Sequence, residues 1–363
     1  MTGRRSAHPY YMHDAILAQP ALVRRLLGER RDAVEHAASD AAAKKRIVFV
    51  GIGTSLHAAM LGERFLRHHS GGRIHVLVEQ SFELVHHPLV LGPEDFVVLI
   101  SHRGWKNFSV EALKRTRDGG ALTLSITGDD GGDGIRTAHH VVTTCEQEVS
   151  FAHTKSYTTA LAALALFGIS VAERHMHATD PAASRRELAA VPDAMQGALA
   201  CEAQVREIAA DVAKRPRLLF IGAGVNWATA WEGALKVKET AYLAAEGFET
   251  EQFLHGPISE ADERASAVAI FNGGAPDERL HAALRALGEV GVLRVAVVPR
   301  GMQGVAAEHV VEVPAVAEWL TPFAQIVPVQ FLSYYLALEL GANPDTGREE
   351  HPAHARAHAA YKL

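Results

Sequence analysis

Short apolar runs alternate with longer amphipathic stretches along most of this chain. In the first half, apolar runs rich in β-branched residues occupy residues 46–50, 74–78, 96–100, 122–126 and 141–144, and helical patterns occupy 56–67, 110–117 and 154–173. Short apolar runs bounded by turn residues indicate buried strands, whereas apolar positions spaced three or four apart indicate helices. Strands that alternate with helices predict a parallel sheet covered by helices on both faces.

The second half of the chain repeats the first at an offset of 171 residues. Arg46 opens the segment RIVFVGIGTSLHAA, and Arg217 opens the matching segment RLLFIGAGVNWATA. Each is an apolar run, two glycines and an Ala-rich stretch, which predicts a strand, a tight turn and the start of a helix. Further strands are expected at 218–221, 268–271, 293–298 and 310–313, with helices at 227–246 and 278–290. The period is too long for a solenoid and predicts two tandem domains.

These patterns assign the chain to the α/β class, with two tandem doubly wound parallel sheets. We expect an N-terminal helical segment at residues 1–45, a first domain at 46–180, a linker helix at 181–214, a second domain at 215–345 and a tail at 346–363. Residues 12–27 and 30–43 carry the N-terminal helices, and 319–340 carry one more long helix. Domains of this size can each bury a core of their own.

The segment EGALKVKE, with the His255-Gly-Pro that follows it, carries the strongest candidate chemistry. Glu232, Lys236 and Glu239 lie at i, i+4 and i+7, so two carboxylates and an amine share one stripe of a helix. The imidazole of His255 falls on a loop sixteen residues after Glu239. A carboxylate and an imidazole can both be tuned to transfer protons near neutral pH, which suits proton movement between neighbouring carbons. For the helix alone, an exposed Glu–Lys salt bridge is the structural alternative.

Two loops follow predicted strands at the edge where doubly wound sheets bind their ligands. The first loop carries Gly53, Thr54 and Ser55. A glycine lets the backbone approach a ligand, and the hydroxyls can cap the next helix or face an anion. The alternatives are a plain helix cap and a dinucleotide turn. The full GxGxxG pattern is absent, so a nicotinamide cofactor is disfavoured and we expect no cofactor.

The second loop, residues 101–107, follows the predicted strand at 96–100. Its polar side chains include Ser101, His102, Arg103 and Lys106. A hydroxyl, a guanidinium and an amine before a helix suit a phosphate, because arginine forms paired hydrogen bonds and the helix start supplies N–H groups. A solvated surface turn is the structural alternative.

Composition and charge exclude several classes of protein. The net charge is −6 with basic and acidic residues interspersed, so we expect no nucleic-acid partner. No apolar run approaches the ~20 residues of a membrane span, and no export signal opens the chain. Cys145 and Cys201 form no CxxC motif, which predicts a cytoplasmic protein with reduced thiols. His354 and His358 lie at i, i+4 without a carboxylate or thiolate companion, so no metal site is expected.

These motifs resemble the tandem SIS (sugar isomerase) family, which includes the isomerase domain of glucosamine-6-phosphate synthase and stand-alone phosphosugar isomerases, deaminases and fructosamine deglycases. EGALKVKE with the following HGP is specific to this group, and Gly53-Thr54-Ser55 and Glu148-x5-Thr154-Lys155 support the resemblance. It covers nearly the whole chain. It implies two doubly wound α/β domains, paired as a homodimer.

The resemblance also implies catalytic roles for the second domain. Glu239 would be the base that moves a proton between C1 and C2 of a phosphorylated sugar. His255 would open the sugar ring, acting from across the dimer. Lys236 and Glu232 would support the developing enediol charge and orient the site. This assignment agrees with the chemistry, because one base must serve two adjacent carbons beside a group that stabilises the enediolate.

By the same resemblance, the first domain would bind the substrate. Ser55 and the 101–106 loop would hold the sugar phosphate, and residues 151–154, with His153 and Thr154, would line the sugar. The loop departs from the family's usual Ser-Gln-Ser-Gly-x-Thr because it reads Ser-His-Arg-Gly-Trp-Lys, and His153 stands where serine is common. These departures favour stronger phosphate binding or another anion, and a substrate other than fructose 6-phosphate.

The two ends of the chain also differ from the family. Lys362 is the candidate for the tail lysine that handles the open-chain sugar, in a tail of different length and sequence. No glutamine-hydrolysing domain and no cysteine near the start accompany the motifs. We therefore expect no glutamine-dependent amidotransfer by this chain alone.

Two hypotheses of function follow from these residues. The first is an enzyme acting on a sugar phosphate or amino-sugar phosphate: an aldose–ketose isomerase, a deaminase or a deglycase. The second is a non-catalytic sugar-phosphate sensor. The presence of both Glu239 and His255 favours the enzyme, because a sensor needs no base.

Overall fold

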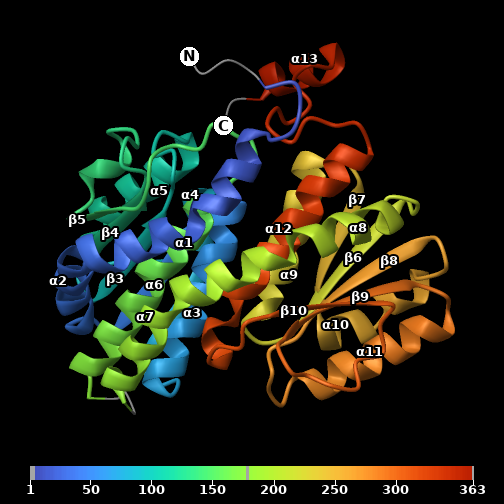
Figure 1. The fold of residues 1–363 in the computed structure, drawn as a ribbon. Coiled ribbons are helices and arrows are strands. Elements are labelled where there is room, and N and C mark those ends of the chain that lie inside the picture. Colours follow the sequence, from blue (N-terminus) through green and yellow to red (C-terminus); the bar gives the residue numbers. More distant parts are fainter. Residues whose placement is uncertain (1–4, 177–179, 362–363) are drawn as a thin grey trace. The chain divides into compact units, whose positions relative to one another are not determined.

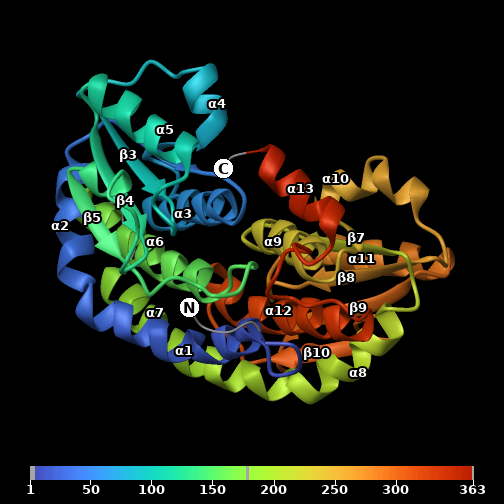
Figure 2. The same cartoon turned by 90° about the horizontal axis from the view of Figure 1, so that it is seen from above.

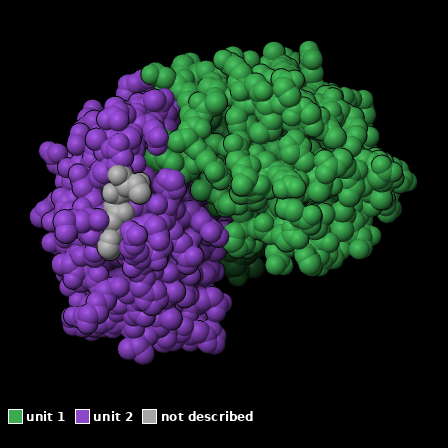
Figure 3. All heavy atoms as spheres, turned by 90° about the horizontal axis from the view of Figure 1, so that it is seen from below, with its two compact units in different colours: residues 1–18, 149–154, 193–362 green, residues 19–148, 155–192, 363 purple. Residues whose placement is uncertain are grey.

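The computed structural model describes residues 5–176 and 180–361, which form two compact units (Figures 1 and 3). Unit 1 contains residues 5–18, 149–154 and 193–361, and unit 2 contains 19–148, 155–176 and 180–192. Helices α1 (Tyr11–Glu29) and α7 (Pro181–Ala198) have residues in both units. Each unit is built around one parallel sheet of five strands, which confirms the predicted fold class.

The sheet of unit 2 has the strand order β2-β1-β3-β4-β5. Its strands are β1 (Arg46–Gly51), β2 (His75–Gln80), β3 (Asp95–Ile100), β4 (Leu122–Thr127) and β5 (His140–Thr143). β1 pairs in parallel with both β2 and β3, so Ile47 lies between Val76 and Phe96. Because helices cover both faces, β1 and β3 are buried almost throughout, which explains their continuous apolar sequence.

Helices cover both faces of the unit 2 sheet (Figure 2). One face carries α2 (Arg31–Ala42), α3 (Thr54–Ser70) and α6 (Lys155–Arg174), and the other carries α4 (Ser81–His86), α5 (Asn107–Asp118) and the single turn η1 (Ile135–Thr137). Alternate residues of β1 point to opposite faces. Val48 and Val50 pack in the core beneath α4 and α5. The ring of Phe49 faces the other side and packs edge-on against the ring of Phe167 of α6, with 6.2 Å between the ring centroids.

Helix α6 is long and apolar enough to cross a membrane by length and composition alone. In the structure, 94% of its most apolar window is buried inside the protein. Helices that are apolar all round are typical of the core of a large domain as well as of membranes. The burial indicates a core helix of unit 2.

Unit 1 has the equivalent strand order, β7-β6-β8-β9-β10. Its strands are β6 (Arg217–Gly222), β7 (Ala244–Glu249), β8 (Ala265–Ile270), β9 (Leu293–Pro299) and β10 (His309–Val313). Its helices are α8 (Glu202–Val212), α9 (Asn226–Thr240), α10 (Thr250–Leu254), α11 (Asp277–Glu289), α12 (Thr321–Glu339) and α13 (Pro352–Ala360). Short turns are η2 (Leu199–Cys201), η3 (Pro257–Glu260) and η4 (Glu318–Leu320).

The same glycine contact recurs in both units. A Cβ on Gly62 of α3 would lie 2.9 Å from the ring of Phe49, and one on Gly233 of α9 would lie 2.9 Å from the ring of Phe220. Both pairs are related by the offset of 171 residues seen in the sequence. In each repeat, the first helix approaches the first strand so closely that only glycine fits. The structure thus confirms the duplication down to individual packing contacts.

Several elements differ from the sequence prediction. The expected helix at 227–246 is wrong at its end, because α9 stops at Thr240 and the edge strand β7 follows at Ala244–Glu249. The segment AAEGFE contains no β-branched residue, so its sequence carries no strand signal. The stretch at 181–214 forms α7, η2 and α8 instead of one helix. The tail expected at 346–363 contains α13, for which the sequence analysis assigned no separate helix.

Candidate active site

Helix α9 brings three of the predicted site residues together. The Nζ of Lys236 lies 2.5 Å from Glu239 Oε2 and 3.3 Å from Glu232 Oε1. The side chains of Lys236 and Glu232 are fully buried, while the side chain of Glu239 is 22% exposed. An ammonium group in the interior requires opposite charges beside it, and the two carboxylates supply them. These residues therefore form a buried charged cluster with one accessible carboxylate, not an exposed surface salt bridge.

The first repeat shows that this fold does not require the charged cluster. At the offset of 171 residues, Glu232, Lys236 and Glu239 correspond to Leu61, Phe65 and His68 of α3. Leu61 and Phe65 are fully buried apolar side chains. Replacing a buried ion pair by well-packed apolar residues is commonly neutral or stabilising, because no ion then has to be desolvated. The buried charges of α9 therefore point to chemistry rather than to folding.

Glu239 lines a cavity of about 750 Å³ within unit 1. Other walls come from Phe151 in the 149–154 segment, from Tyr242 before β7, and from Arg348 and His358 in the tail. Of the charged cluster, Glu239 alone reaches the cavity. A volume of this size suits a small organic molecule. Glu239 is thus the member of the cluster that a molecule in this cavity would meet.

The structure does not bring His255 into this cavity. His255 ends α10, and its side chain is 71% exposed. Its Nε2 lies 3.3 Å from Glu251 Oε1, and the same carboxylate accepts two hydrogen bonds from Arg279 at 2.8 and 3.1 Å. The Arg279 hydrogen bonds hold the pKa of Glu251 below its usual value. Within this chain, His255 is therefore an exposed imidazole away from Glu239's cavity.

The loop that contains Gly53, Thr54 and Ser55 turns sharply between β1 and α3 in unit 2. Gly53 has a φ of +59°, which glycine adopts without strain. A Cβ on the preceding Gly51 would lie 2.3 Å from the Ser55 carbonyl oxygen, so the chain folds tightly back on itself. Thr54 and Ser55 occupy the first turn of α3 and are partly exposed. The hydroxyls thus lie at a helix N-terminus, as the sequence predicted.

The second predicted loop, residues 101–107, follows β3. Hydrogen bonds to its backbone at His102 fix its position. The carbonyl of His102 accepts hydrogen bonds from Gly128 N at 2.9 Å, Thr127 Oγ1 at 3.2 Å and Gln147 Nε2 at 2.9 Å. Ser101 and His102 are buried, and Arg103 and Lys106 are partly exposed. Burial lowers the pKa of Lys106, and the charge of Arg103 lowers it further. Two cations that disfavour each other's charge would both be stabilised by an anion.

The equivalent loop of unit 1 is already occupied by the protein's own carboxylate. Asp277, the first residue of α11, accepts the N–H of Asn272 at 2.8 Å and the N–H of Gly273 at 2.6 Å. In unit 2 the corresponding helix α5 begins at Asn107, which carries no charge. The sequence of the unit 2 loop, residues 101–107, thus contains two cations and no carboxylate, whereas the unit 1 loop binds the carboxylate of Asp277. This difference favours the unit 2 loop as an anion site.

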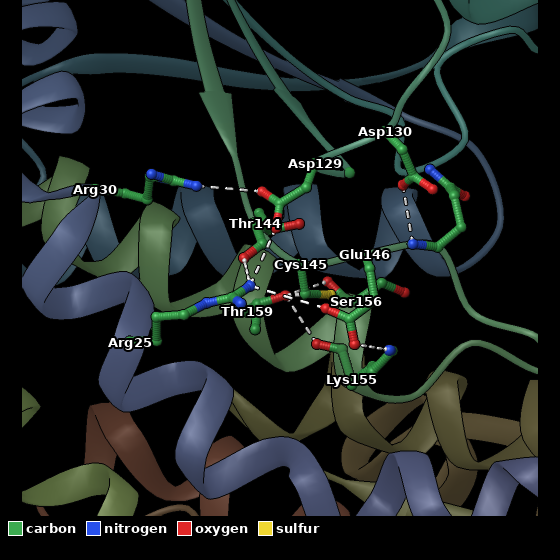
Figure 4. Close-up of polar contacts among 12 residues, drawn as sticks. Arg25, Arg30, Asp129, Asp130, Thr144, Cys145, Glu146, Lys155, Ser156 and Thr159 are labelled. Carbon is green, nitrogen blue, oxygen red and sulfur yellow. Dashed lines mark hydrogen bonds and ion pairs between the residues drawn. The ribbon is translucent and has the colours of Figure 1, made fainter.

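The Glu148-x5-Thr154-Lys155 motif lies at the start of α6, where Figure 4 shows Lys155 beside Glu146. Glu148 Oε1 accepts hydrogen bonds from the N–H and hydroxyl of Ser156 at 2.9 and 2.6 Å. Lys155 Nζ lies 2.5 Å from Glu146 Oε1. Nearby, the guanidinium of Arg25 forms an ion pair with Asp129, with 3.1 Å between Nη2 and Oδ2. A carboxylate at a helix start satisfies N–H groups that lack partners within the helix. The motif is therefore mainly architectural in unit 2.

His153 and Thr154 belong to unit 1 by their contacts. Thr154 is fully buried, and His153 is partly exposed. Neither residue lines the Glu239 cavity, although Phe151 from the same segment does. Lys362, the predicted tail lysine, lies outside the described residues.

Comparison with known proteins identifies the family. The SIS domain matches twice, at residues 41–170 and 211–340. The chain belongs to the SIS domain family. The two SIS domains coincide with the two parallel sheets and with the sequence repeat, which confirms the resemblance inferred from the motifs.

Curated relatives of these SIS domains carry the name glutamine–fructose-6-phosphate aminotransferase (isomerizing). The protein from Thermococcus kodakarensis is 27% identical over 347 residues, covering 95% of this chain and 58% of the relative. The protein from Staphylococcus epidermidis is 31% identical over 360 residues, again covering 95% of this chain and 58% of the relative. The chain thus spans somewhat more than half the length of these relatives.

Solved structures share the tandem SIS fold. The C-terminal domain of glucosamine-fructose-6-phosphate aminotransferase from Francisella tularensis superimposes with a TM-score of 0.86 at 23% identity, covering 94% of this chain and 99% of that one. Tagatose-6-phosphate ketose/aldose isomerase from Escherichia coli gives a TM-score of 0.80 at 22% identity, with 95% and 97% covered. Glucosamine-6-phosphate deaminase from Thermotoga maritima gives 0.74 at 18% identity, with 92% and 96% covered.

The residues of this SIS protein's cavity that the sequence did not predict include Tyr242 and Arg348. No local pattern indicates that the tail after residue 343 folds back beside α9, and only the family resemblance implied a tail residue, Lys362, at the sugar. A partial signal was present, because Pro352 followed by an Ala-rich run is a typical helix start. His354 and His358, considered only as a metal pair, also line the cavity.

Proposed function

We propose that this chain is a phosphosugar-processing enzyme that moves a proton between C1 and C2 of its substrate. It is an aldose–ketose isomerase or an amino-sugar-phosphate deaminase that isomerises as it releases the amine. The observation that carries the proposal is the buried charged cluster of α9, which presents the Glu239 carboxylate alone to a cavity. The names of the relatives and structural neighbours support sugar phosphates and amino-sugar phosphates as the substrate class.

Glu239 acts as the base in this proposal. Its carboxylate removes the proton from the carbon beside the sugar carbonyl and returns it to the neighbouring carbon. Lys236 positions the carboxylate, because its Nζ lies 2.5 Å from one carboxylate oxygen and cannot itself reach the cavity. Glu232 balances the buried ammonium charge from the other side at 3.3 Å.

The unit 2 loops bind the phosphate group of the substrate in this proposal. Arg103 and Lys106 supply positive charge, and Thr54 and Ser55 supply hydroxyls at the start of α3. Phosphate suits these groups because it accepts several charge-assisted hydrogen bonds at once. The positive charges of this loop favour a doubly charged phosphate ester over a neutral sugar.

A homodimer is part of the proposal. His255 is exposed and does not line the cavity of its own chain. If His255 opens the sugar ring, it must therefore act in the site of a second copy of the chain. The thiols of Cys145 and Cys201 are buried and unpaired. Such thiols suit a reducing compartment, which supports the cytoplasm as the location.

A substrate survey by proton NMR in deuterated water tests the proposal. Hexose, pentose and hexosamine phosphates would be incubated with the protein, with ammonia measured in parallel. Loss of the C2 proton signal is expected for at least one phosphorylated sugar, and ammonia release would distinguish the deaminase from the isomerase. Tight binding of a sugar phosphate without any exchange would reject the enzyme and indicate a sensor.

A further inference from the structure

The tail of unit 1, residues 343–361, is fixed against the body of the unit by hydrogen bonds. The Asp345 carboxylate accepts the N–H of Tyr11 at 2.8 Å and the N–H of Met12 at 2.9 Å, at the start of α1. The Asp345 carbonyl accepts the N–H of Phe151 at 2.9 Å. A Cβ on Gly347 would lie 2.7 Å from the Phe151 ring, so the tail passes this ring in close contact. These contacts determine where the next residue, Arg348, enters the cavity.

Arg348 and Tyr242 form a strained pair in the wall of the cavity. Arg348 has a φ of +67° and Tyr242 a φ of +56°, two of the three non-glycine residues with positive φ in the described part of the chain. The guanidinium carbon of Arg348 lies 5.1 Å from the centre of the Tyr242 ring. The Tyr242 hydroxyl donates to the carbonyl of Asn343 at 3.2 Å. A left-handed backbone at such residues costs free energy and commonly marks functional sites.

Of the described residues, Arg348 and Lys238 are the two permanently or ordinarily charged cations that line the cavity beside Glu239, and of these only Arg348 belongs to the strained pair with Tyr242. Lys236 is enclosed by two carboxylates and does not reach the cavity. Desolvation lowers the pKa of His354, and the charge of Arg348 lowers it further, so both effects disfavour a charged imidazole there. Among the described residues, no carboxylate lies within ion-pair distance of Arg348. Its guanidinium is permanently charged and offers several donors in one plane.

We propose that Arg348 binds the carbonyl oxygen of the substrate and stabilises the negative charge that develops there during proton removal. The inference rests on the proposed function, with Glu239 as the base. As the C–H bond breaks, the proton moves to Glu239 and the electron pair forms the C1–C2 double bond. The π pair of the carbonyl then moves onto its oxygen, which becomes the enediolate oxygen facing Arg348. A preorganised cation at that oxygen stabilises the transition state more than the ground state.

Substitution of Arg348 tests this role with a substrate that the wild-type protein processes. Arg348→Ala is expected to lower kcat about 100-fold with a smaller change in KM, the usual effect of losing one donor to a developing oxyanion. Arg348→Lys is expected to keep an intermediate rate. Added guanidinium ion should restore part of the rate of Arg348→Ala but none of the rate of Glu239→Gln. Arg356→Ala is the matched control, because this exposed arginine of α13 does not line the cavity.

The outcomes separate this inference from the proposed function. Exchange in the wild type with an equal kcat in Arg348→Ala would overturn the role of Arg348 and leave the enzyme intact. A raised KM with unchanged kcat would show that Arg348 only binds substrate, which also overturns the role. Absence of exchange by the wild type on every sugar phosphate would overturn the proposed function and this inference with it.

Discussion

Lys236 lies between two carboxylates, and of these three charged groups only Glu239 lines the cavity. Glu232 and Lys236 are fully buried, so Glu239 is the accessible member of the cluster. The sequence spacing predicted that the three side chains share one helix stripe. It could not predict their burial, because an exposed helix has the same Glu–Lys spacing. Burial depends on the strand and helix packed against α9.

The pKa of Lys106 gives a pH-dependent prediction. Burial and then the charge of Arg103 lower this pKa in the free protein, while a bound phosphate favours the charged amine. Affinity for a sugar phosphate should therefore be full below the lowered pKa and fall as pH rises through it. Lys106→Arg stays charged, so its affinity should stay constant up to about pH 10. Calorimetric titrations across this range would measure both proteins, and parallel pH profiles would contradict the assignment.

The position of helix α9 depends on its close packing against β6. This packing also sets the position of the charged cluster that α9 carries. A Cβ on Gly233 would lie 2.7 Å from Val329 Cγ1 and 2.9 Å from the Phe220 ring. The strand β6 and the start of α9 were predicted from the sequence because the apolar run and the two glycines are local signals. The strand β7 was not, because its pairing with β6 depends on contacts distant in sequence. Positive φ at Tyr242 and Arg348 had no sequence signal either.

Gly233→Ala should destabilise the protein by about 1–3 kcal/mol, because the added methyl group overpacks the interface of α9 with β6 and α12. Gly28→Ala in α1 is the matched control, since a Cβ there meets nothing within 4 Å. The control should be neutral or stabilising by up to about 1 kcal/mol, because alanine has the higher helix propensity. Urea denaturation would compare the two, and equal midpoints would refute the close-packing argument.

At the scale of the whole molecule, two repeats share one fold and differ in chemistry. The first repeat has apolar residues where α9 has its charged cluster, and the second has Asp277 where the first has a loop with Arg103 and Lys106. The duplication and the α/β class could be predicted because local patterns of apolar residues indicate them. The division into domains at 46–180 and 215–345 remains a proposal. Local sequence patterns did not predict the return of the tail to the cavity, because the hydrogen bonds of Asp345 that fix it join residues distant in sequence; only the family resemblance implied a tail residue at the sugar.

Mixing two inactive variants tests whether the site is shared between subunits. Glu239→Gln and His255→Ala each remove one proposed group, so each homodimer should be inactive. If His255 acts across the dimer, half of the subunits pair as heterodimers after equal mixing, and each heterodimer has one intact site of two. About a quarter of wild-type activity should then return after co-refolding. No recovery in verified heterodimers would place both groups in one subunit.

The central claim is that Glu239 is the base, and isotope exchange in Glu239→Gln tests it most directly. The variant removes the proton acceptor with little change in shape, so binding of the sugar phosphate should remain near that of the wild type. Exchange of the substrate C2 proton with deuterated water, measured by NMR, should fall to the level of buffer alone. Exchange at the wild-type rate, with binding intact, would contradict the account.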